Sequence, residues 1–310
     1  MTTALLTHEA CLRHVTPRGH PERAARLEAI ARALDAPAFA GLMRESAPAG
    51  DDALLRLAHP QRHIDRLRAS LPAEGFHPLD PDTWLSPGSL QAAQHAAGAQ
   101  RRAAELVMSG TATNAFLAVR PPGHHAEAER PMGFCLFANA VLAARSAIEL
   151  GAGRVAIVDF DVHHGNGTQA LVWDDPDILF ISTHQMPLWP GTGAPDERGA
   201  HGNVLNIPLP PGSDGSLMRE RAETLILPAL DAFRPDLMVI SAGFDAHAAD
   251  PLAGLEWVED DYAWLTGRLC AAARRLCGGR VISTLEGGYD LDALAGSVAA
   301  HVATLMEWSR

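Results

Sequence analysis

Short apolar runs alternate with longer amphipathic stretches from one end of the chain to the other. The apolar runs contain many β-branched residues and end at polar or glycine-containing turns, which is typical of buried strands. We expect strands over Leu5 to Thr7, Thr113 to Val119, Arg154 to Asp161, Ile178 to Thr183, Val204 to Ile207, Leu237 to Ser241 and Arg280 to Leu285.

The stretches between these runs carry apolar residues at helical spacing. We expect helices over Pro21 to Leu34, Gln61 to Ser70, Pro87 to Met108, Phe137 to Leu150, Gly215 to Phe233, Asp260 to Leu276 and Asp290 to Trp308. Strands that alternate with helices predict an α/β fold, with an open and mainly parallel sheet flanked by helices. No break in composition divides the 310 residues, so we expect a single domain over residues 1 to 310.

The composition narrows the class of protein. Hydrophobic residues make up 47% of the chain and charged residues 20%, which provides apolar surface for a large core. The formal net charge of −12, without a basic stripe, argues against nucleic acid as a direct partner. The four cysteines are scattered, and we find neither a signal-peptide pattern nor an apolar run of about 18 residues. These features predict a cytoplasmic location and no membrane partner.

Four polar segments each follow a predicted strand. They are LAVRPPGHHA, DFDVHHGNGT, SAGFDAHAADPL and LEGGYD, which begin at residues 117, 159, 241 and 285. Ligands of open α/β sheets bind beyond the carboxyl ends of the strands. The placement therefore predicts that four segments far apart in sequence form one crevice.

Asp161 and His163 are two residues apart, and on an extended chain this spacing puts both side chains on the same face. Asp245, past another predicted strand, is the best-placed third ligand. Two carboxylates and an imidazole leave open positions on a divalent ion, which is typical of catalytic zinc. Taken singly, Asp161 and His163 also fit a capped turn at a strand end, and Asp245 fits a helix N-cap.

His124 and His125 follow two prolines and a glycine, and histidine suits proton transfer near neutral pH. Asp159 is a candidate carboxylate behind one of the two rings. Tyr289 follows two glycines, which would allow its phenol to reach a substrate carbonyl. The alternatives are an incidental histidine pair and a tyrosine that packs in the core.

Taken together, RPPGHHA, GFCLFANA, DFDVHHGNGT, PGTG, SAGFDAHAADPL and LEGGYD resemble the zinc-dependent histone deacetylase family, in particular its class II and bacterial amidohydrolase-like members. Their order and spacing match from GHPERAARL near the start to the final predicted helix. The resemblance implies an arginase/deacetylase fold with a central parallel sheet of about eight strands. It also implies hydrolysis of N-acyl amides, most of all the deacetylation of acetyl-lysine side chains in peptides or proteins.

The resemblance further implies a role for each matching position. Three residues look like the ligands of one zinc ion: Asp161, His163 and Asp245. The implied catalytic set is His124 and His125 on the zinc-bound water, Asp159 and Asn166 behind them, and Tyr289 on the amide carbonyl. A structural potassium site is implied at Asp159, Asp161, His163, Ser182 and Thr183.

The resemblance also implies six substrate-binding residues: Gly133, Phe134, Trp189, Leu252, Gly287 and Gly288. Trp189 stands where phenylalanine is more usual in the family, which leaves the preferred acyl group open. Polyamine-selective relatives have a glutamate where this chain has Leu252, so the resemblance favours acyl-lysine. An acetylpolyamine or other small-molecule amidohydrolase is the alternative. A two-manganese ureohydrolase fits the histidine pair poorly, and a non-catalytic binder would have lost a ligand or Tyr289.

Overall fold

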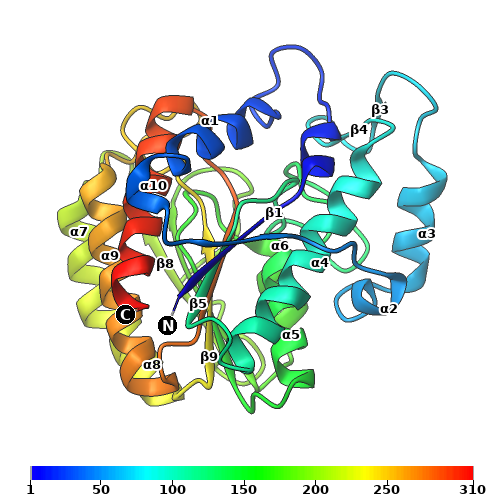
Figure 1. The fold of residues 1–310 in the computed structure, drawn as a ribbon. Coiled ribbons are helices and arrows are strands. Elements are labelled where there is room, and N and C mark those ends of the chain that lie inside the picture. The colour runs from blue at the N-terminus through cyan, green and yellow to red at the C-terminus, as the bar shows by residue number, and fades with distance from the viewer. Residues whose placement is uncertain (1, 310) are drawn as a thin grey trace.

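A parallel sheet runs through the centre of the protein, whose computed structural model describes residues 2–309 (Figure 1). Within these residues the sheet has eight strands in the order β2-β1-β5-β10-β9-β6-β7-β8, and each neighbouring pair is parallel. The strands are β1 (Thr3–Thr7), β2 (Met43–Ser46), β5 (Asn114–Leu117), β6 (Val155–Asp159), β7 (Ile178–Gln185), β8 (Val204–Leu209), β9 (Leu237–Ala242) and β10 (Val281–Leu285). Two short strands outside it, β3 (His77–Pro78) and β4 (Trp84–Leu85), pair antiparallel.

Helices lie on both sides of the sheet (Figure 1). One side carries α1 (Ala25–Leu34), α7 (Gly215–Arg221), α8 (Leu227–Phe233), α9 (Glu259–Cys277) and α10 (Leu291–Trp308). The other carries α2 (Asp52–Leu55), α3 (Gln61–Ala69), α4 (Ser89–Met108), α5 (Asn139–Glu149) and α6 (Asn166–Val172). Three short elements complete the chain: the 3-10 helices η1 (Glu9–Arg13) and η2 (Pro37–Phe39) and the π-helical turn η3 (Ala222–Ile226).

The central strands are buried along their whole length. Every residue of β6 and of β9 is buried, because helices cover both faces of the sheet at these positions. Strands that are buried on both faces consist of consecutive apolar residues, which is why these strands could be predicted from the sequence. Strands β5, β10, β9 and β6 are consecutive in the sheet, so the four polar segments that follow them meet at one edge. The predicted α/β architecture and the shared edge are confirmed.

Several predicted boundaries are wrong. The helix expected from Pro21 begins at Ala25, and the strand expected to reach Asp161 ends at Asp159. Strand β2 was missed because it is a polar edge strand whose residues are alternately half-buried and exposed. Helix α6 was missed because its glycine-containing start looks like a turn.

The helix expected over Gly215 to Phe233 is interrupted by the π-helical turn η3. Pro228 follows this turn and lacks a backbone N–H, so the regular α-helical hydrogen bonds cannot continue through it. Among the described helices, none combines the length and the apolar character needed to cross a membrane.

Two helical glycines provide a matched test of packing. A Cβ on Gly98 in α4 would lie 2.0 Å from the carbonyl oxygen of Pro48, whereas a Cβ on Gly267 in α9 would meet only side-chain atoms, at 3.7 and 3.8 Å. We expect Gly98→Ala to lower the free energy of unfolding by about 1–3 kcal/mol through overpacking. Gly267→Ala should raise it by about 0.4–1 kcal/mol, because alanine loses less entropy in a helix. Urea unfolding measures both, and equal effects would contradict the close approach at Gly98.

Candidate active site

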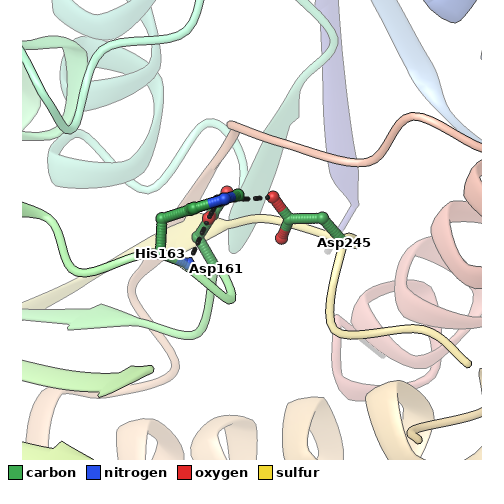
Figure 2. A group of neighbouring side chains, drawn as sticks. All are labelled: Asp161, His163 and Asp245. Carbon is green, nitrogen blue, oxygen red and sulfur yellow. Dashed lines mark hydrogen bonds and ion pairs between the residues drawn. The ribbon is translucent and has the colours of Figure 1, made fainter. Parts of the chain in front are cut away.

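Three metal-capable side chains converge at the carboxyl edge of the sheet (Figure 2). His163 Nδ1 lies 3.1 Å from Asp161 Oδ1 and 3.1 Å from Asp245 Oδ2. The potential ligand atoms of the three residues all lie within 4.8 Å of one another. Asp161 and Asp245 are buried, and His163 is nearly so. The grouping inferred from spacing is therefore present in space.

The reason given for that grouping needs a correction. Asp161 and His163 do not lie on an extended strand, because β6 ends at Asp159 and the chain bends from residue 161. The bend is held by backbone donors: the N–H of Asp161 donates to Asp159 Oδ1 and the N–H of His163 donates to Asp161 Oδ1. A local turn, rather than strand alternation, brings the two side chains together. Asp245 caps no helix, because residues 243 to 251 contain no helical residue.

The glycine segment after β10 closes the other side of the group. The N–H of Gly287 donates to Asp161 Oδ2 at 2.8 Å. A Cβ at Gly287 would lie 2.1 Å from Asp245 Oδ2, so only glycine allows this backbone to approach both carboxylates. The N–H of Val162 donates to Asp245 Oδ1 at 2.9 Å, which ties the segments after β6 and β9 together.

The pKa of each residue in this group depends on the charges of the other two. Although burial opposes ionisation of the ring, hydrogen bonds to Asp161 and Asp245 raise the pKa of His163 to about 10. Burial, with the nearby charge of Asp161, raises the pKa of Asp245. Two adjacent buried carboxylates require a positive charge, which a protonated His163 ring can supply. A divalent cation would replace that proton, and the set of two carboxylates and one imidazole fits such an ion.

The predicted histidine pair lies beside this group. The rings of His124 and His125 have centroids 3.9 Å apart, and the ring of His125 lies 6.0 Å from that of His163. His124 Nδ1 lies 3.0 Å from Asp159 Oδ2, as the sequence suggested. Burial opposes protonation of His124, but the charges of Asp161 and Asp159 raise its pKa well above the usual value.

Asn166 fixes the hydrogen bonding of the second histidine. His125 Nδ1 lies 2.8 Å from Asn166 Oδ1, while Asn166 Nδ2 donates to Glu127 Oε1 at 2.9 Å. Because the amide oxygen can only accept, His125 Nδ1 carries a proton and its Nε2 is free to accept one. Burial, followed by the charges of His124 and His163, lowers the pKa of His125 well below its usual value. The two rings are therefore held in different electrostatic environments.

Tyr289 lies at the same edge, and two residues that the sequence did not identify hold it. The N–H of Tyr289 donates to Asp250 Oδ2 at 2.7 Å, and the guanidinium carbon of Arg26 lies 5.0 Å from its ring centre. Arg26 also donates to the carbonyl oxygen of Gly288 at 2.6 Å. Both Arg26 and Asp250 are buried, and burial together with the charge of Asp245 raises the pKa of Asp250 to about 7. The sequence did contain a sign of Asp250, because it is a second charged residue in the segment SAGFDAHAADPL that also carries Asp245.

Aromatic rings border the site. The ring of Phe134 packs edge-on against Tyr289 with centroids 5.9 Å apart, and the ring of Trp189 packs edge-on against His125 at 4.6 Å. Gly133 lies between His125 and Trp189, since a Cβ there would be 2.4 Å from the first ring and 2.6 Å from the second. Trp189 therefore packs on the site and is not confined to its own loop, although its side chain is 43% exposed.

The remaining predicted residues lie around this centre. Ser182 is the neighbour of Asp159 across the β6–β7 pair, and Thr183 follows it with a buried hydroxyl that has no hydrogen-bond partner within residues 2–309. Leu252 is 36% exposed, and its N–H donates to Asp250 Oδ1. His164, next to a predicted ligand, turns away to Thr192 and Gln169.

Comparisons with known proteins agree with this architecture. The histone deacetylase domain family matches residues 20–305. A histone deacetylase-like amidohydrolase from Pseudomonas aeruginosa is 42% identical over 252 residues, which cover 80% of this chain and 66% of that protein. A probable deacetylase from Archaeoglobus fulgidus is 37% identical over 302 residues, covering 94% and 82%. The crystal structure of the HDA15 HD domain matches with a TM-score of 0.94 and 35% identity, covering 99% of this chain and 88% of that one.

The parallel sheet and the buried group at its carboxyl edge define a hydrolase of the arginase/deacetylase fold that acts on amides. The chain belongs to the histone deacetylase family.

The donor set predicts how metal binding responds to substitution. We expect the wild type to retain about one divalent ion per chain after dialysis, and Asp245→Ala to retain less than about a tenth of that. Asp250→Asn is the matched control, because Asp250 is a buried carboxylate of the same segment that lies outside the donor group. Metal analysis of the purified proteins measures all three. Equal loss in both variants would contradict the assignment of Asp245.

Proposed function

We propose that the protein is a zinc-dependent deacetylase of acetyl-lysine side chains in peptides or proteins. The observation that carries this proposal is the placement of His125, whose Nδ1 lies 2.8 Å from Asn166 Oδ1, beside Asp161, His163 and Asp245. An amide hydrolase needs a base for water, a cation or donor for the carbonyl oxygen and an acid for the leaving amine. The residues at this edge can supply each of them.

Zinc held by Asp161, His163 and Asp245 would supply a Lewis acid that polarises the acyl carbonyl and acidifies water. His125 Nε2 accepts the proton of the attacking water, because its Nδ1 is occupied by Asn166. Asp159 orients His124, and its carboxylate offsets the positive charge that then develops on the pair. The hydroxyl of Tyr289 donates to the oxyanion. A histidine returns the proton to the amine, so the products are a lysine and a short carboxylate.

We also propose a structural potassium ion next to this centre, held by Asp159, Asp161, His163, Ser182 and Thr183. The register that sets Asp159 beside Ser182 and the unpartnered hydroxyl of Thr183 support it. Several of these residues would bind the ion through backbone oxygens, which suit a hard monovalent cation, whereas the imidazole ring of His163 suits zinc.

The substrate assignment rests on the rim of the site. Leu252 is partly exposed and uncharged, so it offers no carboxylate to a distant ammonium group of a polyamine. The segment between residues 73 and 86 forms only the short β3–β4 pair, without an added element that would narrow the entrance. Hydrolysis of acetylpolyamines or other small acyl amides is the alternative. The packing of Trp189 against His125 leaves the acyl group to be decided by experiment.

We place this activity in one domain, residues 1–310, and in the cytoplasm. The eight parallel strands within the described residues belong to one sheet, which supports a single domain. The four cysteines are buried and unpaired, as expected in a reducing compartment.

Substrate choice is tested by the ratio of kcat/KM for an acetyl-lysine peptide to that for acetylputrescine on the zinc-loaded protein. We expect the ratio to exceed about ten, because the rim lacks a charge for the amine of the polyamine. A ratio well below one would make the protein a polyamine amidohydrolase. If the zinc-loaded protein hydrolyses neither substrate, amides with longer acyl groups should be tested next.

The two tyrosines of the chain provide a matched test of the oxyanion donor. We expect Tyr289→Phe to lower kcat about 100- to 1000-fold with unchanged zinc content, because one donor to the transition state is lost. Tyr262→Phe removes another buried hydroxyl, one without a hydrogen-bond partner among residues 2–309, and should leave kcat unchanged. Unchanged kcat in Tyr289→Phe would remove this residue from the mechanism.

A further inference from the structure

One buried carboxylate at the catalytic edge has no part in the chemistry described above. Glu286 is the first residue after β10, and its side chain is fully buried. Within the described residues it makes no ion pair with arginine or histidine at 4.0 Å or less. A buried carboxylate without such a partner is costly, so its hydrogen bonds indicate what it does.

Both oxygens of Glu286 accept hydrogen bonds. Oε2 accepts from the backbone N–H of Gly123 at 2.6 Å and from that of His124 at 3.1 Å. Oε1 accepts from the hydroxyl of Ser241, at the end of β9, at 2.9 Å. One carboxylate oxygen therefore binds two consecutive N–H groups of the segment that carries the catalytic histidines.

The backbone of Glu286 is fixed as firmly as its side chain. Its carbonyl oxygen accepts from Arg26 at 2.5 Å, and its N–H donates to the carbonyl oxygen of Ala242. The next residue, Gly287, donates to the metal-capable Asp161, and Tyr289 follows two positions later. Glu286 thus lies at the junction of three groups that must be in register for catalysis: the histidine pair, the carboxylate group and the phenol.

Without Glu286, the N–H groups of Gly123 and His124 would lose an acceptor at a site where backbone is buried. The hydrogen bond from His124 Nδ1 to Asp159 would remain, but it restrains the ring and not the backbone of the turn. A displacement of about 1 Å in a catalytic group can reduce rate about 100-fold. The carboxylate is therefore placed to control geometry at His124 and His125 without touching the substrate.

We propose that Glu286 is a positioning residue that sets the histidine pair in register with Tyr289 and Asp161, through the N–H groups of Gly123 and His124. This inference deepens the proposed function, because it assumes that the pair moves protons during amide hydrolysis. Geometry, rather than negative charge, is the property that Glu286 contributes. Glutamine at this position keeps an oxygen for the two N–H groups and can donate its amide to Ser241, so it should preserve the function.

The experiment compares Glu286→Ala and Glu286→Gln with the wild type in two measurements. Steady-state kinetics on the acyl amide that the wild type hydrolyses best should show kcat about 100-fold lower in Glu286→Ala. KM should stay within threefold, and Glu286→Gln should recover at least a tenth of the wild-type kcat. Hydrogen exchange of the amides of Gly123 and His124 should be slow in the wild type and in Glu286→Gln, and fast in Glu286→Ala.

Asp236→Ala is the matched control. Asp236 Oδ2 also accepts from two consecutive N–H groups, those of Gly153 and Arg154, but at the opposite edge of the sheet. The Asp236→Ala substitution should accelerate exchange at the amides of Gly153 and Arg154 and leave kcat unchanged.

If the Glu286→Ala variant does not fold, the Glu286→Asp variant replaces it in both measurements. Aspartate retains the carboxyl group, but its shorter side chain moves the acceptor oxygen away from the two N–H groups. We therefore expect kcat to fall below that of Glu286→Gln and exchange at Gly123 and His124 to become faster.

The inference would be overturned by wild-type exchange rates at Gly123 and His124 in Glu286→Ala, by an unchanged kcat in that variant, or by an equal loss of kcat in Asp236→Ala. A kcat as low in Glu286→Gln as in Glu286→Ala would also reject it, since charge would then be the property required. A wild type that hydrolyses no acyl amide would refute the proposed function instead. The exchange measurements need no substrate and would still decide whether Glu286 anchors the turn.

Discussion

Two buried carboxylates, those of Asp161 and Asp245, lie on either side of His163 Nδ1, each 3.1 Å from it. Like charges in a buried site repel one another strongly, so the fold must supply positive charge and hydrogen-bond donors around them. The N–H groups of Val162 and Gly287 are two of these donors. Because a divalent cation can replace the proton of His163, the same compensation that stabilises the fold prepares a metal site.

Hydrogen bonds around these charges connect the segments that follow β5, β6, β9 and β10. Asp159 orients His124, and Asn166 orients His125, so each ring of the pair has a different partner. Asp250 holds the backbone of Tyr289 from a third segment. Since each segment is held by groups on its neighbours, the site forms only when all four strands are in place. Hydrogen bonds of this kind restrain side chains that lie on loops.

The catalytic centre and the rim of the site contribute differently to function. The centre is a set of buried polar groups whose partners are fixed, as expected for the shared chemistry of the family. Trp189 and Leu252, to which the proposed function assigns contacts with the substrate, are instead partly exposed. Differences in binding of the transition state at such positions set substrate preference. In the proposed function, the reaction class therefore follows from the buried centre, and substrate preference is assigned to Trp189 and Leu252.

The sequence by itself determined the alternation of strands and helices, the four polar segments and the identity of the metal-capable, histidine and tyrosine positions. It did so because buried parallel strands are continuous apolar runs and because the motifs are local. Only the tertiary structure decided that a bend, and not strand alternation, joins Asp161 to His163, and that Asp250, Arg26 and Glu286 hold the reacting groups. These contacts link residues 39 to 262 positions apart, and no local pattern encodes a partner at such a distance.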